Sequence, residues 1–239
     1  MTSSSAVVAL IPARAGSKRL PNKNMHPFHG KPLAAWTLEL VRGIELFDSI
    51  IVSTDDEQLR ALASADSVFT VRGRPEKLST DTATVLDVIR HVADEQALAP
   101  ETVVVILQVT APLRVASDIT EALRLFEAHD RRRSVVSVSE NTYPPALLWR
   151  IGPDGGLIST APGRGTASAR KQDHDSTYFW NDVVLVDSVA NFSRPRRNIF
   201  GDDPIPLMVP RERGVAIDYP VQMTMAAALF PPHDERLPQ

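Results

Sequence analysis

A cationic loop follows the first apolar segment of the chain. Residues 7–13 (VVALIPA) are almost entirely apolar, and residues 14–24 place four cations around a single glycine: Arg14, Gly16, Lys18, Arg19 and Lys23. Clustered cations and backbone N–H groups bind polyphosphates, and glycine lets a ligand approach the backbone closely. One glycine is too few for a GxGxxG or Walker A motif. We predict a phosphate-binding loop of another type at the end of the first strand.

The elements that must position this loop alternate along the front half of the chain. Hydrophobic runs predict strands, and apolar residues at helical spacing predict helices between them. Asp81 is placed to cap one of these helices. The predicted strands are 7–13, 49–56, 67–71, 102–108, 134–139 and 181–186; the predicted helices are 33–43, 57–63, 81–96, 118–129 and 217–230.

This alternation favours an α/β fold with a doubly wound, mostly parallel sheet of Rossmann-like type, whose ligand lies at the carboxyl ends of the strands. The rhythm breaks at residues 140–178, which are rich in Pro, Gly, Ser and Thr. We therefore predict a nucleotide-binding domain over residues 1–139 and 179–239, with 140–178 as an inserted dimerisation or lid segment.

Composition excludes several classes of function. The 239 residues carry 26 Lys and Arg against 29 Asp and Glu, and this near-neutral balance gives no support for a nucleic-acid partner. The absence of cysteine excludes disulfides, thiolate zinc sites and a cysteine nucleophile. No apolar stretch is long enough for a membrane span. The sequence is expected to form a cytoplasmic protein with no membrane partner.

Six motifs in order resemble the CMP-sialic acid synthetase family, the cytidylyltransferases that activate acidic sugars. The first of them is the most specific, and together they extend over nearly the whole chain. They are IPARAGSKRLPNKN (11–24), RPEKLSTDTAT (74–84), LQVTAPLR (107–114), RKQ (170–172), YFWN (178–181) and IDYP (217–220).

The resemblance implies transfer of a cytidylyl group from CTP to a hydroxyl of an acidic sugar of the nonulosonate kind, with release of pyrophosphate. Arg14, Lys18 and Asp218 are then the catalytic residues. The segment 13–18, together with Asn24, Arg74 and the start of a helix, would bind the nucleotide. The implied nucleotide-binding residues are Ala13, Arg14, Ala15, Gly16, Ser17, Lys18, Asn24, Arg74, Ala83, Thr84 and Val85.

The resemblance also implies an acceptor site, a metal and a partner subunit. Asp218 would hold Mg²⁺, a hard cation that prefers carboxylate and phosphate oxygens. The family forms homodimers in which the inserted segment crosses to the partner, so a homodimer is expected. The implied acceptor-binding residues are Gln108, Arg170, Lys171, Gln172 and Asn181.

The sequence departs from the family pattern mainly near the metal and the acceptor. Ala216 and Gln222 stand where the family has acids, and Phe179 and Asp182 replace its arginine and glycine beside Asn181. Two alternatives follow from these departures. The acceptor could be another acid, such as a different ulosonate or a phosphonate, or the chain could be a CTP-binding module without turnover.

Overall fold

The computed structural model describes residues 5–143, 145–160, 175–196 and 198–230. Its helices are α1 (Leu33–Arg42), α2 (Glu57–Ser64), α3 (Val85–Glu95), α4 (Ala116–Ala128), α5 (Val189–Ser193) and α6 (Pro220–Ala228), with 3-10 turns at Lys23–Met25, Glu76–Leu78 and Pro145–Leu147. Its strands are β1 (Val7–Ala13), β2 (Pro27–Phe28), β3 (Lys31–Pro32), β4 (Ser49–Thr54), β5 (Phe69–Gly73), β6 (Val103–Ile106), β7 (Val135–Asn141), β8 (Trp149–Ile151), β9 (Leu157–Ser159), β10 (Thr177–Ser188) and β11 (Ile205–Met208).

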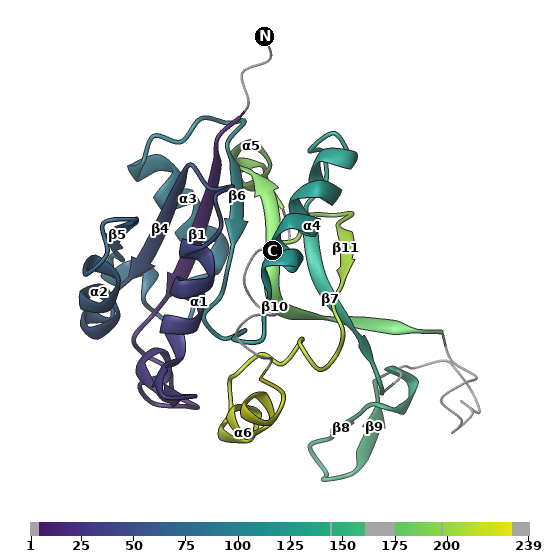
Figure 1. Ribbon diagram of the computed structural model, residues 1–239. Coiled ribbons are helices and arrows are strands. Elements are labelled where there is room, and N and C mark those ends of the chain that lie inside the picture. Colours follow the sequence, from purple (N-terminus) through teal and green to yellow (C-terminus); the bar gives the residue numbers. More distant parts are fainter. Residues whose placement is uncertain (1–4, 144, 161–174, 197, 231–239) are drawn as a thin grey trace.

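A seven-stranded sheet forms the centre of the described chain, in the order β11-β7-β10-β6-β1-β4-β5 (Figure 1). β6, β1, β4 and β5 pair in parallel, as do β11 and β7, whereas β10 runs antiparallel to both of its neighbours. The predicted fold class, a mostly parallel α/β sheet, is confirmed. The carboxyl ends of the parallel strands meet at one edge, where ligands bind in such sheets.

Helices cover both faces of this sheet, because alternate residues of a strand point to opposite sides. On β1, Ala9 and Ile11 pack in one core with α1, α2 and α4, while Val8 and Leu10 pack in a second core with α3 and α5. Both cores are closed to water, which explains why the central strands are nearly continuous apolar runs.

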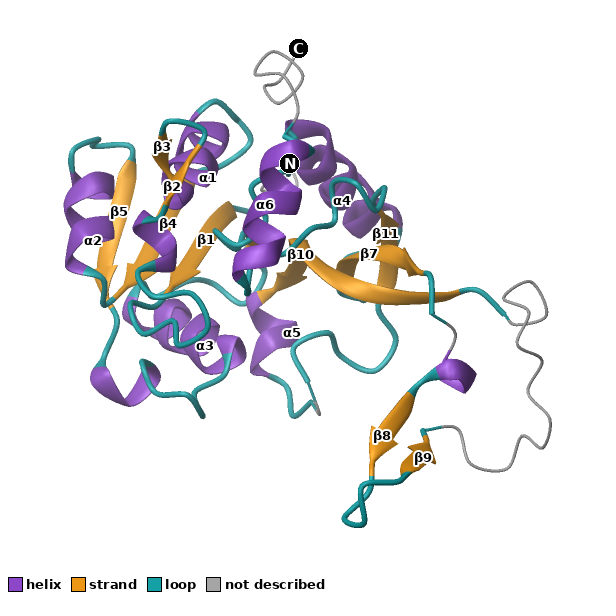
Figure 2. Cartoon of the chain, turned by 90° about the horizontal axis from the view of Figure 1, so that it is seen from below, coloured by secondary structure: helices purple, strands orange, loops and turns teal. Residues whose placement is uncertain are grey.

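A projecting hairpin lies between β7 and β10. β8 and β9 pair with each other and with no other described strand, and they stand away from the main sheet (Figure 2). Several of their large apolar side chains are exposed, including Trp149, Ile151 and Leu157. β7 and β10 stay paired as far as Asn141 and Thr177, so the main sheet extends slightly into the predicted 140–178 segment.

The prediction that Asp81 caps a helix over 81–96 was wrong. The helix begins at Val85, and Thr84 caps it in a capping box with Asp87. A threonine hydroxyl followed three residues later by a carboxylate satisfies two helix-end N–H groups, which Asp81 is too far upstream to reach. No helix in the described part of the chain has the length and hydropathy needed to cross a membrane.

Candidate active site

The predicted phosphate-binding loop leaves β1 at the carboxyl edge of the sheet. Its cations reach across to the segment before α3: Arg14 donates to the Asp81 carboxylate at 2.9 Å and to the Thr80 carbonyl at 3.1 Å. Lys18 pairs with the other oxygen of Asp81. Lys18 and then Arg14 hold the pKa of that carboxyl below its usual range. Because these pairs are exposed and weak, a more highly charged phosphate group can compete for both cations.

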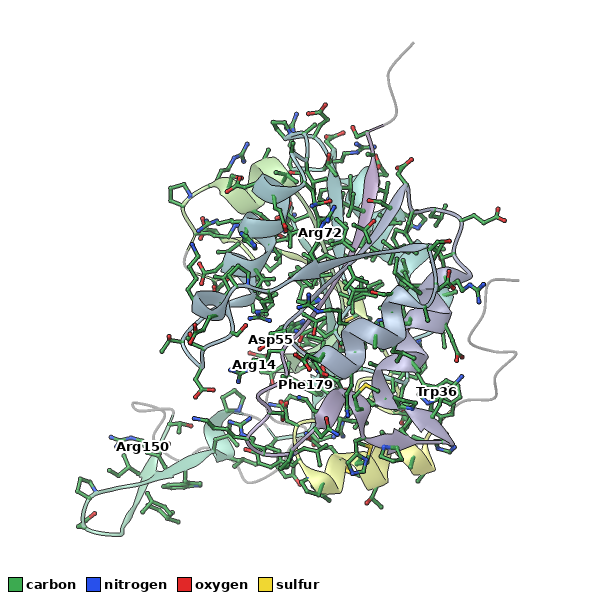
Figure 3. The ribbon with its side chains drawn as sticks, turned by 90° about the vertical axis from the view of Figure 1, so that its left-hand side faces the viewer. Arg14, Trp36, Asp55, Arg72, Arg150 and Phe179 are labelled. Atoms are coloured by element: carbon green, nitrogen blue, oxygen red, sulfur yellow. The ribbon has the colours of Figure 1, made fainter. Side chains whose placement is uncertain are left out.

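Backbone and side-chain bonds fix the shape of the loop. The Ala15 N–H donates to Asp55 at 2.9 Å, and the buried Asn24 amide donates to the Arg14 carbonyl at 3.0 Å and to Asp56 at 3.1 Å. Figure 3 shows Arg14 and Asp55 next to each other at this edge. Asp56 also caps α2. Asn24 therefore ties the end of the loop to its beginning.

The remaining predicted nucleotide residues surround this loop. Ala13 is buried at the end of β1, Ser17 is bonded back to Ala15 through its N–H, and nothing lies within 4 Å of a Cβ built on Gly16. On the other side, Arg74 follows β5 and donates to the Leu78 carbonyl at 2.6 Å. Burial lowers the pKa of the Arg74 guanidinium, and Asp55 acts in the opposite direction.

The start of α3 lies beside the same cations. The Ala83 N–H donates to Thr80 at 3.2 Å, and Thr84 and Val85 are the cap and first residue of the helix. The structure thus brings the sequence-predicted nucleotide residues 13–18, 74 and 83–85 to one edge. A helix N-terminus and a cationic loop both favour an anionic ligand, and here they lie at the same edge of the sheet.

Asp218 lies against the far end of the cationic loop. Lys23 donates to its carboxylate at 2.8 Å across 195 positions of sequence. The Gln222 side-chain oxygen accepts from the N–H groups of Asp218 and Tyr219 at 2.7 and 2.8 Å, and it caps α6. Gln222 is therefore a helix cap that holds the backbone of Asp218, and the 218 carboxylate remains half exposed beside Lys23.

A second carboxylate, Asp182, occupies the same region. It accepts from the Thr110 hydroxyl at 3.1 Å and from the Gln108 amide at 3.3 Å. Burial raises the pKa of Asp182 to about 6; the negative charge of Asp218 raises it as well, whereas Thr110, Lys23 and Arg114 lower it. The charges of Asp218 and Lys23 therefore both act on the Asp182 carboxyl.

Arg114 supports this region from inside the protein. It is fully buried, and its guanidinium donates to the backbone carbonyls of Gln108 (2.8 Å), Asp182 (3.3 Å) and Val183. A planar guanidinium with several N–H groups can satisfy several carbonyls at once. Arg114 consequently fixes the loop after β6 against β10.

The predicted acceptor-binding residues lie in different surroundings. Gln108 faces Asp182, as described above, whereas Asn181 is fully buried and donates to Ser139 at 2.8 Å. The Asn181 amide nitrogen is thus already used within the protein. Arg170, Lys171 and Gln172 lie outside the described residues. Sugar contacts by all of these residues stay predictions.

The sequence identified Lys23 only as one of the loop cations and assigned no role to Asp182. Lys23 was visible as a loop cation, but only folding brings it to Asp218. Asp182 was visible only as a departure from the family glycine. Its backbone has a φ of 62°, a conformation that glycine adopts freely and that aspartate tolerates better than most residues. The sequence feature that could have drawn attention to Asp182 is therefore an aspartate at a position where the family has glycine.

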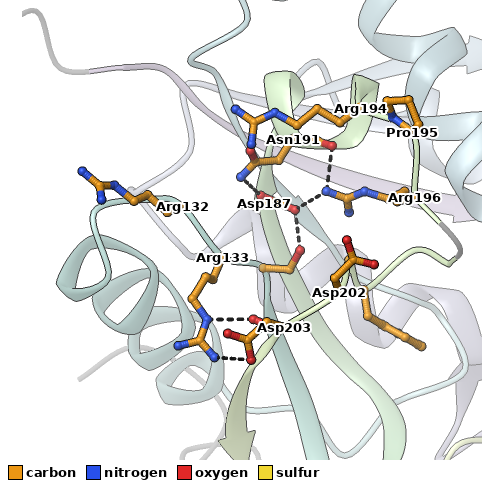
Figure 4. A pocket seen from close by; sticks show the side chains of 12 residues that line it. Arg132, Arg133, Asp187, Asn191, Arg194, Pro195, Arg196, Asp202 and Asp203 are labelled. Atoms are coloured by element: carbon orange, nitrogen blue, oxygen red, sulfur yellow. Dashed lines mark hydrogen bonds and ion pairs between the residues drawn. The ribbon is translucent and has the colours of Figure 1, made fainter.

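The opposite edge of the sheet contains a separate cavity of about 220 Å³. Figure 4 shows its charged lining, in which buried Arg196 pairs with fully buried Asp187 at 2.9 Å and Arg133 pairs with Asp203 at 2.7 Å. Asp187 also accepts from Asn191 at 2.6 Å and from Ser134. The charges of these residues neutralise each other, so this cavity is a structural network distant from the cationic loop.

Comparisons with known proteins agree with the motif resemblance. The family model described as Cytidylyltransferase matches residues 8–143. An N-acylneuraminate cytidylyltransferase of Escherichia coli is 37% identical over 149 residues, which are 59% of this chain and 33% of that protein. A CMP-N,N'-diacetyllegionaminic acid synthase of Legionella pneumophila is 36% identical over 157 residues, 64% of this chain and 66% of that protein.

The fold has relatives among solved structures. A CMP:2-keto-3-deoxy-manno-octonic acid synthetase complexed with CTP superposes with a TM-score of 0.68 at 18% identity, covering 94% of this chain and 98% of that one. This likeness supports the fold. The chain spans less than half the length of the N-acylneuraminate cytidylyltransferases that it matches in Escherichia coli and Streptococcus agalactiae.

Proposed function

Because the chain belongs to the cytidylyltransferase family, we propose that it transfers CMP from CTP to a hydroxyl group of an acidic sugar of the nonulosonate kind and releases pyrophosphate. The observation that carries this proposal is the 2.8 Å bond between Lys23 and Asp218. It places the carboxylate at the end of the phosphate-binding loop, so that the triphosphate and the acceptor can meet there. Relatives that act on N-acylneuraminate and diacetyllegionaminic acid support the acceptor class.

The chemistry requires positioning and charge rather than covalent catalysis. The acceptor hydroxyl releases its proton to water, and its oxygen forms a bond to the α-phosphorus of CTP while the bond to pyrophosphate breaks. Arg14 and Lys18 would neutralise negative charge on the phosphate oxygens, and Arg74 with residues 83–85 would frame the base. Charge that is fixed before the reaction lowers the barrier because it needs no reorganisation.

Mg²⁺ is part of this proposal, and the donor set fits it. Asp218 offers exposed carboxylate oxygen, and no group of three or more His, Cys, Asp or Glu residues is placed to hold a metal among the described residues. Mg²⁺ is suited to such a site because it takes most of its ligands from phosphates and water. When bound, the cation supplies positive charge at the phosphate oxygens. A cytoplasmic setting is also proposed, with which the cysteine-free sequence is compatible.

Pyrophosphate release from CTP and Mg²⁺ across a panel of acidic acceptors tests the reaction. The panel contains N-acetylneuraminate, other nonulosonates, a shorter ulosonate and a phosphonate, with ATP, GTP and UTP as nucleotide controls. CTP-specific release with a nonulosonate is the expected result. If pyrophosphate is released only with another acid, that acid is the acceptor and the nonulosonate class is wrong. CTP binding without any pyrophosphate release supports the non-catalytic module instead.

Removal of the Lys18 charge is expected to weaken nucleotide binding. The loss of one charged contact, about 1.5–3 kcal/mol, predicts at least a roughly tenfold higher Kd for CTP in Lys18→Ala. Isothermal titration calorimetry with CTP measures this change. Arg42→Ala, which removes one exposed cation at the end of α1, is the matched control. An unchanged Kd in Lys18→Ala removes Lys18 from the nucleotide site.

A homodimer formed through the β8–β9 hairpin is also proposed. Ile151 and Leu157 are 76% and 67% exposed, and a partner subunit would cover them. Each buried side chain of this size contributes about 1.5–3 kcal/mol, so the double variant Ile151→Asp/Leu157→Asp is expected to be a monomer. Light scattering coupled to gel filtration distinguishes the two states. Leu46→Asp, at an exposed apolar residue elsewhere, should remain a dimer; a monomeric unmodified protein contradicts the proposal.

A further inference from the structure

Asp182 is held at the site by an irregularity in β10. The pairing of β10 with β7 shifts register between Trp180 and Leu185, and Asp182 adopts its φ of 62° within this interval. Bulges of this kind often occur beside active sites, where they redirect a side chain. Left-handed backbone at a residue other than glycine is unfavourable and persists only where the surrounding structure maintains it. Here the surroundings include the Arg114 guanidinium, which binds the Asp182 carbonyl.

Thr110 joins Asp182 to Asp218. Its hydroxyl donates to the Asp182 carboxylate at 3.1 Å, and its carbonyl accepts from the N–H of Ile217, the neighbour of Asp218, at 2.8 Å. Thr110 therefore binds the Asp182 carboxylate directly and holds the backbone next to Asp218. Lys23, which donates to Asp218, lies close enough to stabilise the charge of Asp182 too. Lys23 thus pairs directly with Asp218 and acts on Asp182 only through its charge.

The residues that could otherwise assist Asp218 are not available. Position 216 is alanine, and the side-chain oxygen of Gln222 is used in capping α6. Mg²⁺ bound with substrate phosphates takes one or two protein carboxylates. Asp182 is the carboxylate that the fold brings toward Asp218 from a different strand.

We propose that Asp182 is a second carboxylate ligand of the divalent cation, acting together with Asp218. This inference rests on the proposed function, because it concerns the cation that accompanies CTP. The metal site is then formed jointly by β10, which carries Asp182, and by the loop before α6, which carries Asp218. Asp182 completes a site for which residues 216–222 supply only one carboxylate.

The test compares CTP binding with and without a metal. Calorimetry gives the Kd of CTP in EDTA and in Mn²⁺ for the whole chain, and the ratio of the two is the metal-dependent gain in affinity. Electron paramagnetic resonance of Mn²⁺ reports bound metal directly and independently of turnover. The variants are Asp182→Asn, Asp182→Gly and Asp218→Asn. Asp182→Gly suits the left-handed backbone, so it guards against a loss of folding.

Asp130→Asn is the matched control. Asp130 is an exposed aspartate with a φ of 55°, it lies between α4 and β7 at the opposite edge of the sheet, and it undergoes the same chemical change. The metal-dependent gain in CTP affinity of Asp130→Asn should equal that of the unmodified protein.

The expected result is a loss of about tenfold or more in the metal-dependent gain in both Asp182 variants and in Asp218→Asn, since each removes one ligand. CTP binding in EDTA should be unchanged or tighter, because a negative charge near the triphosphate has gone. A full gain in Asp182→Asn and Asp182→Gly overturns the inference, as does a full gain in Asp218→Asn or the absence of any gain in the unmodified protein. Absence of CTP binding in the unmodified protein instead overturns the proposed function.

Discussion

Asp218→Asn is expected to lower kcat for pyrophosphate release by about 100-fold or more, because it removes the most exposed carboxylate of the proposed metal site. Asparagine keeps the size of the side chain and can still accept from Lys23, so the loop should retain its shape. The Kd of CTP in EDTA is expected to change less than about threefold. Stopped-flow or coupled measurement of pyrophosphate at saturating CTP and acceptor gives kcat separately from KM.

One control variant makes this result specific. Asp130→Asn removes an exposed carboxylate at the opposite edge of the sheet and should keep the unmodified kcat. An Asp218→Asn protein with the unmodified kcat contradicts a role of Asp218 in turnover. If CTP binds but neither the unmodified protein nor Asp130→Asn releases pyrophosphate with any acceptor, a non-catalytic CTP-binding module becomes the better description.

The second large effect concerns stability. Asp187→Ala is expected to lower the free energy of unfolding by about 3–5 kcal/mol, because it leaves the buried Arg196 guanidinium without its carboxylate. Asp187 is completely buried and Arg196 is 7% exposed, so the variant leaves a largely buried positive charge without its counter-charge. Denaturation by urea, followed by circular dichroism, measures the change.

Asp203→Ala provides the comparison. Asp203 pairs with Arg133 at the rim of the same cavity, but its side chain is 79% exposed, so its loss should cost less than about 1 kcal/mol. Asp187→Asn, which keeps an acceptor oxygen, should have an intermediate effect and remains measurable if the alanine variant does not fold. Equal small losses in Asp187→Ala and Asp203→Ala contradict a stabilising role for the buried pair.

The sequence predicted the central elements well because their signals are local. β1 begins and ends at the predicted residues 7 and 13, and the runs at 49–56 and 102–108 contain β4 and β6. Each of these strands is almost entirely buried, and each contains a run of three or more consecutive apolar residues. The hairpin of β8 and β9 and the edge strand β11 were not predicted, because each of these strands is only three or four residues long.

The site was predictable where residues are contiguous and unpredictable where contacts are distant. The loop at residues 13–18 could be recognised from its cations alone. The role of Asp81 could not be, since its interaction with Arg14 depends on how the strand ends come together. The connection from Lys23 to Asp218 spans most of the chain, and the placement of Asp182 depends on a bulge that no residue pattern announces.

The bulge in β10 also has an evolutionary consequence. On one side of it, Thr177–Trp180 pairs with Ser139 and its neighbours near the projecting hairpin; on the other, Leu185 and Val186 pair deep in the sheet. The irregularity between them uncouples the two registers. Insertions, deletions or substitutions in the outer half can therefore accumulate without displacing the inner half, which also pairs with β6 on its other side.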